Sequence, residues 1–133
     1  MTAGGDILIV DDDADMTEVI ELVLQEAGYH TRTAVNGRDA LEAVAASMPS
    51  LILLDMLMPV MNGAQFAREF RARHGGAVPI VIATAAEHAC SRGEEIDATD
   101  LLAKPFDVAD LLRLVSRYVT PSRPAHSPDA PAP

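Results

Sequence analysis

The sequence is poor in cysteine, in aromatic residues and in positive charge, and it contains no long apolar run. Its single cysteine cannot form an internal disulfide or a zinc site built on paired cysteines, which favours an intracellular protein. No apolar stretch approaches the roughly 18 residues that suggest a membrane span. The start of the chain also lacks the basic and apolar regions of a signal peptide. We therefore expect a cytoplasmic protein without a membrane partner.

Aromatic residues and basic residues are both scarce. Two Tyr, three Phe and no Trp leave few side chains for stacking on bases or flavin rings. Ten Lys and Arg residues against twenty Asp and Glu residues give a formal net charge of −10 at pH 7. Because such a surface repels phosphate backbones and anionic lipids, we expect no direct binding to nucleic acid. Basic partners and cations fit the surface better.

Aliphatic residues are plentiful and can form a packed core. Hydrophobic residues make up 49% of the 133-residue chain and charged residues 23%, as in one globular domain. The end of the chain, residues 121–133, holds five of the nine prolines and has no apolar periodicity. We predict one domain over residues 1–120, followed over 121–133 by a disordered Pro/Ala-rich tail or linker stub.

Short apolar runs predict five strands. Three uninterrupted runs are too short for helices and are typical of strands buried on both faces, and two weaker runs complete the set. The strong runs are residues 7–10, 51–54 and 80–83, and the weaker ones are 29–34, which carries Arg32 as an edge strand can, and 101–103.

Segments with helical spacing separate these strands. Apolar residues recur at intervals of three and four over residues 16–27, 40–45, 66–70 and 108–119. Asp13, Asn62 and Asp107 stand where N-caps are expected, and Gly28 where the first helix ends. Residues 87–96 have a central glycine and a thin apolar face, which predicts a short or mobile helix.

Alternating strands and helices predict an α/β fold with a doubly wound, five-stranded parallel sheet. Five such units favour the flavodoxin-like strand order 2-1-3-4-5. In such folds the functional crevice lies at the carboxyl ends of the strands.

Carboxylates follow two strands that are neighbours in this order. Asp11, Asp12 and Asp13 come directly after the first strand, and Asp55 directly after the third. Converging carboxylates repel one another unless a cation or protons intervene, and Mg²⁺ favours carboxylate oxygens, a backbone carbonyl and water. The alternative is that the acidic triplet is only a solvated turn in which Asp13 caps the first helix. Asp55, at the end of a fully apolar strand, favours the metal site.

A hydroxyl and an ammonium stand at the ends of the fourth and fifth strands, at the same edge. Thr84 ends the fourth strand and Lys104 the fifth. A threonine hydroxyl can donate one directed hydrogen bond, and a lysine is a point charge suited to anions. With a nucleophilic carboxylate and a cation site beside them, they suit a phosphoryl group carried on a carboxylate.

With these residues, the chain resembles the receiver domains of two-component response regulators, and the chemotaxis regulators among them. The resemblance rests on segments in family order over residues 6–120: ILIVDDD at 7–13, LILLDMLMPVMNG at 51–63, VIATA at 81–85 and LLAKPF at 101–106. It implies a phosphorylation-dependent signalling switch rather than an enzyme acting on diffusible substrates. The domain would accept a phosphoryl group from a histidine kinase or phosphotransfer protein, and would catalyse this transfer and its own dephosphorylation.

The resemblance also implies a role for each site residue. Asp55 would be the phosphoacceptor, while Thr84 and Lys104 would hold the phosphoryl oxygens. The ligands of Mg²⁺, the implied cofactor, would be Asp11, Asp12, Asp55 and the backbone carbonyl of Leu57. A downstream protein would bind the fourth helix, fifth strand and fifth helix.

Three positions depart from the family pattern. Leu101 stands where many members have an aromatic switch residue, three residues before the lysine. Leu57 and Ala86 stand two residues after Asp55 and Thr84, where polar side chains could orient a hydrolytic water. Because Leu57 and Ala86 have no polar side chain, we predict slow loss of the phosphoryl group.

Other functions fit the sequence less well. An aspartyl phosphohydrolase typically has a second acid two residues after its nucleophile, where this chain has Leu57. A flavodoxin-like electron carrier needs a phosphate-binding loop after the first strand, where three acids would repel flavin phosphate. A remaining alternative within signalling is that the chain is the N-terminal receiver module of a longer regulator with a separate output domain.

Overall fold

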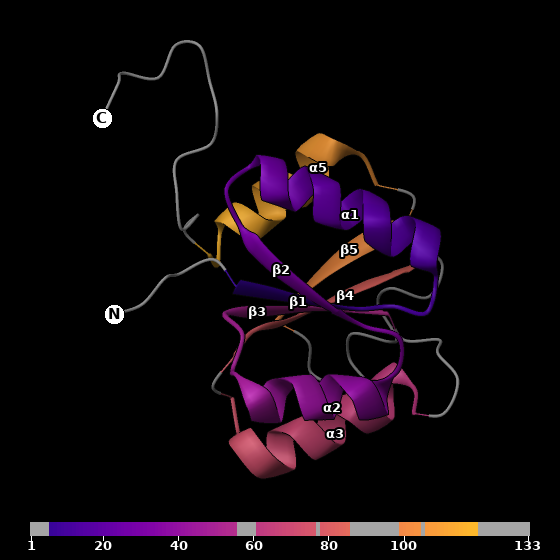
Figure 1. The fold of residues 1–133 in the computed structure, drawn as a ribbon, viewed down its shortest axis with the longest axis vertical. Coiled ribbons are helices and arrows are strands. Elements are labelled where there is room, and N and C mark those ends of the chain that lie inside the picture. Colours follow the sequence, from indigo (N-terminus) through magenta and orange to yellow (C-terminus); the bar gives the residue numbers. More distant parts are fainter. Residues whose placement is uncertain (1–5, 56–60, 77, 86–98, 105, 120–133) are drawn as a thin grey trace.

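A five-stranded parallel sheet forms the middle layer of the molecule, as the computed structural model shows (Figure 1). The structure describes residues 6–55, 61–76, 78–85, 99–104 and 106–119, and for residues 84 and 85 only the backbone. The strands are β1 (Asp6–Val10), β2 (His30–Ala34), β3 (Leu51–Leu54), β4 (Ile80–Ala85) and β5 (Asp100–Lys104). All neighbours pair in parallel, in the order β2-β1-β3-β4-β5. The predicted fold class and strand order are therefore confirmed.

Helices cover both faces of this sheet. The helices α1 (Ala14–Glu26) and α5 (Val108–Ser116) lie on one face, and α2 (Gly37–Ala46) and α3 (Gly63–His74) lie on the other (Figure 1). The helix predicted for residues 87–96 and the tail predicted for 121–133 lie outside the described residues. None of the helices in the described part is long and apolar enough to span a membrane.

The hydrophobic core is divided by the sheet into two clusters. Alternate residues of β1 point to opposite faces, so that Ile7 and Ile9 pack toward α1 and α5, whereas Leu8 and Val10 pack toward α2 and α3. All four side chains are at most 1% exposed. Burial on both faces explains why the central strands have no polar alternation.

Each of the predicted caps begins a helix. The Asp13 carboxylate accepts hydrogen bonds from the Asp15 and Met16 N–H groups at the start of α1. Asp107 accepts from Asp110 N–H at the start of α5. Asn62 and Gln65 form a reciprocal capping box at the start of α3. The turns between strands and helices are thus specified by local side chains.

The strand boundaries differ slightly from the sequence prediction. β2 begins at His30 rather than Tyr29, because Gly28 has a φ of 99° and the Tyr29 N–H still bonds to the Leu24 carbonyl of α1. β4 and β5 each extend beyond their apolar runs, to Ala85 and to Lys104. The longer β4 and β5 bring polar residues at their ends into the sheet.

Charge is distributed unevenly over the two faces. Residues 11–26, which include α1, hold seven acidic residues and no Lys or Arg. On the opposite face, α3 holds three arginines and a single glutamate. The net charge of −10 therefore does not describe both sides of the molecule equally.

Candidate functional site

The sheet itself fixes the backbones of two site aspartates. Asp11 directly follows β1 and Asp55 directly follows β3, at the carboxyl edge of neighbouring strands. Asp11 N–H donates to the Ala34 carbonyl at 3.0 Å, and Asp55 N–H donates to the Val10 carbonyl at 2.9 Å. The hydrogen-bond ladder thus continues one residue past each strand and places both aspartates in register.

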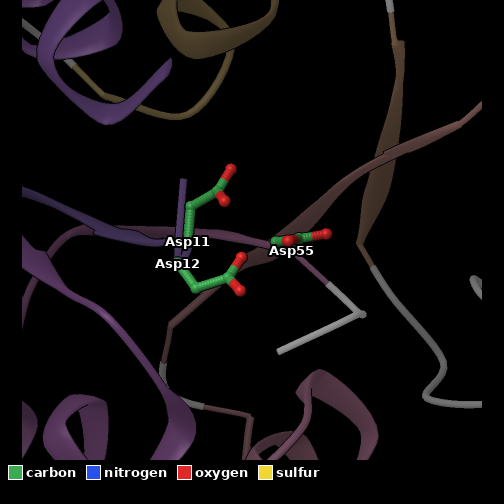
Figure 2. A group of neighbouring side chains, drawn as sticks. All are labelled: Asp11, Asp12 and Asp55. Atoms are coloured by element: carbon green, nitrogen blue, oxygen red, sulfur yellow. The ribbon is translucent and has the colours of Figure 1, made fainter. Parts of the chain in front are cut away.

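Three carboxylates converge at this edge. One carboxylate oxygen from each of Asp11, Asp12 and Asp55 lies within 4.8 Å of the others (Figure 2). Asp11 is buried at 4% exposure, Asp55 is half-buried and Asp12 is exposed. Such an arrangement of hard oxygen donors, open to solvent on one side, fits a small divalent cation such as Mg²⁺. The structure therefore brings together the three aspartates that the sequence pointed to as metal ligands.

Lys104 joins the same cluster from the far edge of the sheet. Its Nζ lies 3.2 Å from Asp11 Oδ2, in an ion pair whose lysine side chain is 24% exposed. The second oxygen, Asp11 Oδ1, accepts a hydrogen bond from Asp13 N–H at 3.0 Å. Both oxygens of the buried Asp11 thus have partners, and the ammonium offsets part of the negative charge.

Two further residues predicted for the site are described only in part or not at all. Thr84 lies in β4 opposite Ala103, next to the pairing of Ala85 with Lys104, so its backbone is at the same edge. The Thr84 side chain, Leu57 and Ala86 lie outside the described part of the chain.

Met61, six residues after Asp55, is held by the start of α2. Gly37 N–H donates to the Met61 carbonyl at 2.9 Å. A Cβ atom added at Gly37 would lie 2.8 Å from the Met61 carbonyl oxygen and 2.7 Å from Met61 Cγ. Only glycine allows this approach. The sequence pattern did not reveal this contact, because the helical periodicity begins at Ala40.

Leu101, at the position of the usual switch aromatic, is partly buried. It pairs with Ile82 in the sheet and packs against the core cluster beneath α2 and α3. An aliphatic side chain in this place has no polar tip that could bond to solvent or to a site group.

A second polar cluster, which sequence reasoning missed, ties the start of β5 to the end of α5. Asp100 Oδ2 accepts hydrogen bonds from the Tyr118 hydroxyl at 2.8 Å and from Arg117 at 3.2 Å. Burial of the Asp100 carboxyl acts to raise its pKa, but bonds from Leu101 N–H and Tyr118 and the charge of Arg117 bring the pKa below its ordinary value. The same hydrogen bond to Asp100 raises the pKa of Tyr118. This cluster stabilises the β5–α5 surface.

An apolar groove of about 370 Å³ also lies beside the acidic cluster, between α1 and α5. Met16, Val19, Val23 and other apolar residues line it, with acidic side chains that include Asp13 and Asp107. The helical patterns gave no sign of it, because a groove depends on how two helices pack.

Comparison with known proteins assigns the chain to a family. The family model described as "Response regulator receiver domain" matches residues 7–116. The response regulator MprA of Mycobacterium sp. (strain KMS) is 34% identical over 128 residues, which cover 95% of this chain and 55% of that protein. The DNA-binding response regulator MtrA of Mycobacterium tuberculosis (strain H37Rv) is 40% identical over 111 residues, covering 82% and 48%. The chain thus spans about half the length of these relatives.

Solved structures agree with this assignment. The Vibrio cholerae chemotaxis protein CheY4 superposes with a TM-score of 0.77 at 32% identity, covering 86% of this chain and 98% of that one. The receiver domain of NtrX from Brucella abortus gives a TM-score of 0.77 at 30% identity, covering 85% and 97%. The family model spans most of the chain, and the solved structures share both its fold and its sequence pattern. This chain therefore belongs to the response regulator receiver domains of two-component systems.

Proposed function

We propose that the chain is a phosphorylation-dependent switch whose Asp55 accepts a phosphoryl group from a histidine kinase or phosphotransfer protein. The observation that carries this proposal is the convergence of Asp11, Asp12 and Asp55 within 4.8 Å, with Lys104 paired to Asp11. A structural turn would not require three carboxylates and an ammonium from three separate strands to meet at one point. A site for a transferring phosphoryl group does require them.

The transfer would be a nucleophilic displacement at phosphorus. A carboxylate oxygen of Asp55 attacks the phosphorus of a phosphohistidine, and a P–O bond forms while the P–N bond breaks. The donor imidazole leaves with the electron pair of the broken bond, and the product is an acyl phosphate on Asp55. The backbone bond from Asp55 N–H to Val10 holds the nucleophile in line with the edge of the sheet.

Asp11, Asp12 and Asp55, with the carbonyl of Leu57, would hold Mg²⁺. When bound, Mg²⁺ would neutralise charge on the phosphoryl oxygens. Lys104 would supply the second positive charge, and its pairing with Asp11 keeps its Nζ at the site. The Thr84 hydroxyl would donate to a phosphoryl oxygen. Autodephosphorylation would be the hydrolysis of the same acyl phosphate by water.

The downstream signal would leave through the fourth helix, β5 and α5. Within the described part of this surface, Asp100, Arg117 and Tyr118 tie β5 to α5. MtrA, of which the match to this chain covers 48%, is named a DNA-binding response regulator. We propose that this chain acts as a receiver module, either by itself or ahead of an output domain in a longer regulator, and contacts a protein rather than DNA.

Intact mass measurement tests the phosphoacceptor. The parent protein is incubated with Mg²⁺ and a small acyl phosphate donor, and the expected gain is the mass of one phosphoryl group. Asp55→Asn should show no gain, whereas Asp110→Asn, an exposed aspartate on α5, should be labelled like the parent. Equal labelling of the parent and Asp55→Asn would disprove the assignment.

A further inference from the structure

Asp13 connects the start of α1 to the buried carboxylate of Asp11. Its backbone N–H donates to Asp11 Oδ1 at 3.0 Å. Its own side-chain oxygen, Oδ1, accepts from Asp15 N–H at 3.1 Å and from Met16 N–H at 3.2 Å. The side chain of Asp13 is therefore hydrogen-bonded to the first turn of α1, while its backbone N–H is hydrogen-bonded to Asp11 at the site.

These bonds fix the orientation of Asp11. Lys104 holds Asp11 Oδ2 and Asp13 N–H holds Oδ1, so the plane of the carboxylate is set by one partner on each oxygen. Each carboxylate oxygen has two lone-pair positions, so an oxygen that accepts one hydrogen bond can still bind a cation. The position of Asp13 N–H in turn depends on the extended backbone of the cap, with φ −87° and ψ 101°. The cap side chain stabilises that conformation.

We infer that Asp13 is a positioning residue that sets the affinity of the site for Mg²⁺ through its cap rather than through its charge. This inference rests on the proposed function, because it assumes that Asp11 is a metal ligand. Groups that hydrogen-bond to a metal ligand and fix its orientation strongly influence metal binding, and their loss weakens the affinity for the metal about tenfold. Without the cap, the first turn of α1 frays, and the N–H that orients Asp11 is no longer held in place.

Two uncharged variants separate the cap from the charge. Asp13→Ser and Asp13→Ala both remove the carboxylate, but only serine can accept the hydrogen bonds of the first turn. Mg²⁺ affinity is measured from the rise in melting temperature with Mg²⁺ concentration, each variant being compared with its own metal-free state. We expect Asp13→Ala to bind Mg²⁺ about tenfold more weakly than Asp13→Ser. A second pair, Asp13→Asn and Asp13→Gln, repeats the comparison should alanine prevent folding.

The control is the equivalent cap on α5. Asp107→Ala also removes a carboxylate and a cap, because the Asp107 side chain accepts a hydrogen bond from Asp110 N–H. Within the described part of the chain, however, no hydrogen bond joins Asp107 N–H to Asp11, Asp12 or Asp55. This variant should melt at a lower temperature and bind Mg²⁺ as the parent does. Equal affinities for Asp13→Ser and Asp13→Ala, or an equal loss in Asp107→Ala, would overturn the inference while leaving the metal site in place. A parent protein that does not respond to Mg²⁺ would overturn the proposed function as well.

Discussion

Lys104 Nζ lies 3.2 Å from Asp11 Oδ2, although β3 and β4 lie between β5, which ends at Lys104, and β1, which Asp11 directly follows. The lysine side chain therefore extends along the carboxyl edge of the sheet and meets a carboxylate that is only 4% exposed. A buried carboxylate beside two others is costly without a positive charge. This ion pair thus links the stability of the fold to the chemistry of the site.

Replacing the lysine should destabilise the protein. We expect Lys104→Met to lower the free energy of unfolding by about 2 kcal/mol, because it leaves Asp11 buried beside two like charges. Urea denaturation without Mg²⁺ measures the change. Adding Asp11→Asn should restore most of the loss, since the uncompensated charge is then gone. Arg113→Met, which breaks an exposed pair with Asp110, should cost less than about 0.5 kcal/mol. An equal loss in both single variants would mean that burial of Asp11 does not matter.

The Asp100–Tyr118 hydrogen bond should give the protein a stability that depends on pH. The pKa of Tyr118 is raised, so this contribution is fully present below the ordinary tyrosine pKa, near pH 10, and is lost as the pH rises through the folded value. The pKa of Asp100 is lowered, so its contribution is present above about pH 4 and is lost as the pH falls further. Between these limits the parent should be more stable than Tyr118→Phe.

Unfolding experiments on the parent and Tyr118→Phe check this profile. The difference between the two proteins should be constant near neutral pH and should shrink above about pH 10. Tyr29 also has a raised pKa, owing to burial, but it is present in both proteins and cancels in the comparison. A difference that stays constant through the alkaline range would contradict the hydrogen bond.

A methyl group at Gly37 should disturb Met61 and, through it, the proposed phosphorylation site at Asp55. Gly37→Ala places an atom within 3 Å of the Met61 backbone, and we expect it to cost about 2 kcal/mol of stability and to slow phosphorylation of Asp55. Gly76→Ala is the matched control, because a Cβ at Gly76 has no atom within 4 Å. Thermal unfolding and the rate of labelling measure the two effects. Identical behaviour of the two variants would show that the Gly37–Met61 contact does not influence the proposed site.

The phosphoryl group on Asp55 should be lost slowly. Neither Leu57 nor Ala86 has a side chain that can hold a water in line with the acyl phosphate. One missing hydrogen bond worth about 1.4 kcal/mol in the transition state slows hydrolysis roughly tenfold. Decay of labelled protein should therefore be faster in Leu57→Asn and Ala86→Glu, and fastest in the double variant. If the variants lose the phosphoryl group at the same rate as the parent, groups other than Leu57 and Ala86 set the lifetime of the acyl phosphate.

The sequence predicted those features that depend on local pattern. The uninterrupted apolar run Ile7–Val10 indicated a strand buried on both faces, and the structure divides its side chains between two core clusters. Asp13 and Asp107 could be placed as caps because the cap rule needs only neighbouring residues. The convergence of Asp11, Asp12 and Asp55 followed from the strand order, because parallel strands end at one edge.

Contacts between distant elements could not be predicted in this way. The Lys104–Asp11 pair depends on how far a side chain reaches across two strands, and no spacing in the sequence encodes that distance. The bond from Tyr118 to Asp100 depends on the position of α5 along β5. One local feature was missed as well. Asn36 caps α2 by accepting a hydrogen bond from Asp39 N–H, but the apolar periodicity begins only at Ala40 and did not mark the start of this helix.

The opposite charge of α1 and α3 gives the domain an electric polarity across its sheet. A protein with a basic contact surface would be rotated during diffusion so that it meets the acidic side, where Asp11 and Asp12 lie beside Asp55, the proposed phosphoacceptor. The charge distribution would then act on the rate at which a donor associates with the domain, more than on the affinity of the final complex. Added salt should slow transfer from such a donor by screening this polarity, and should have far less effect on labelling by a small acyl phosphate.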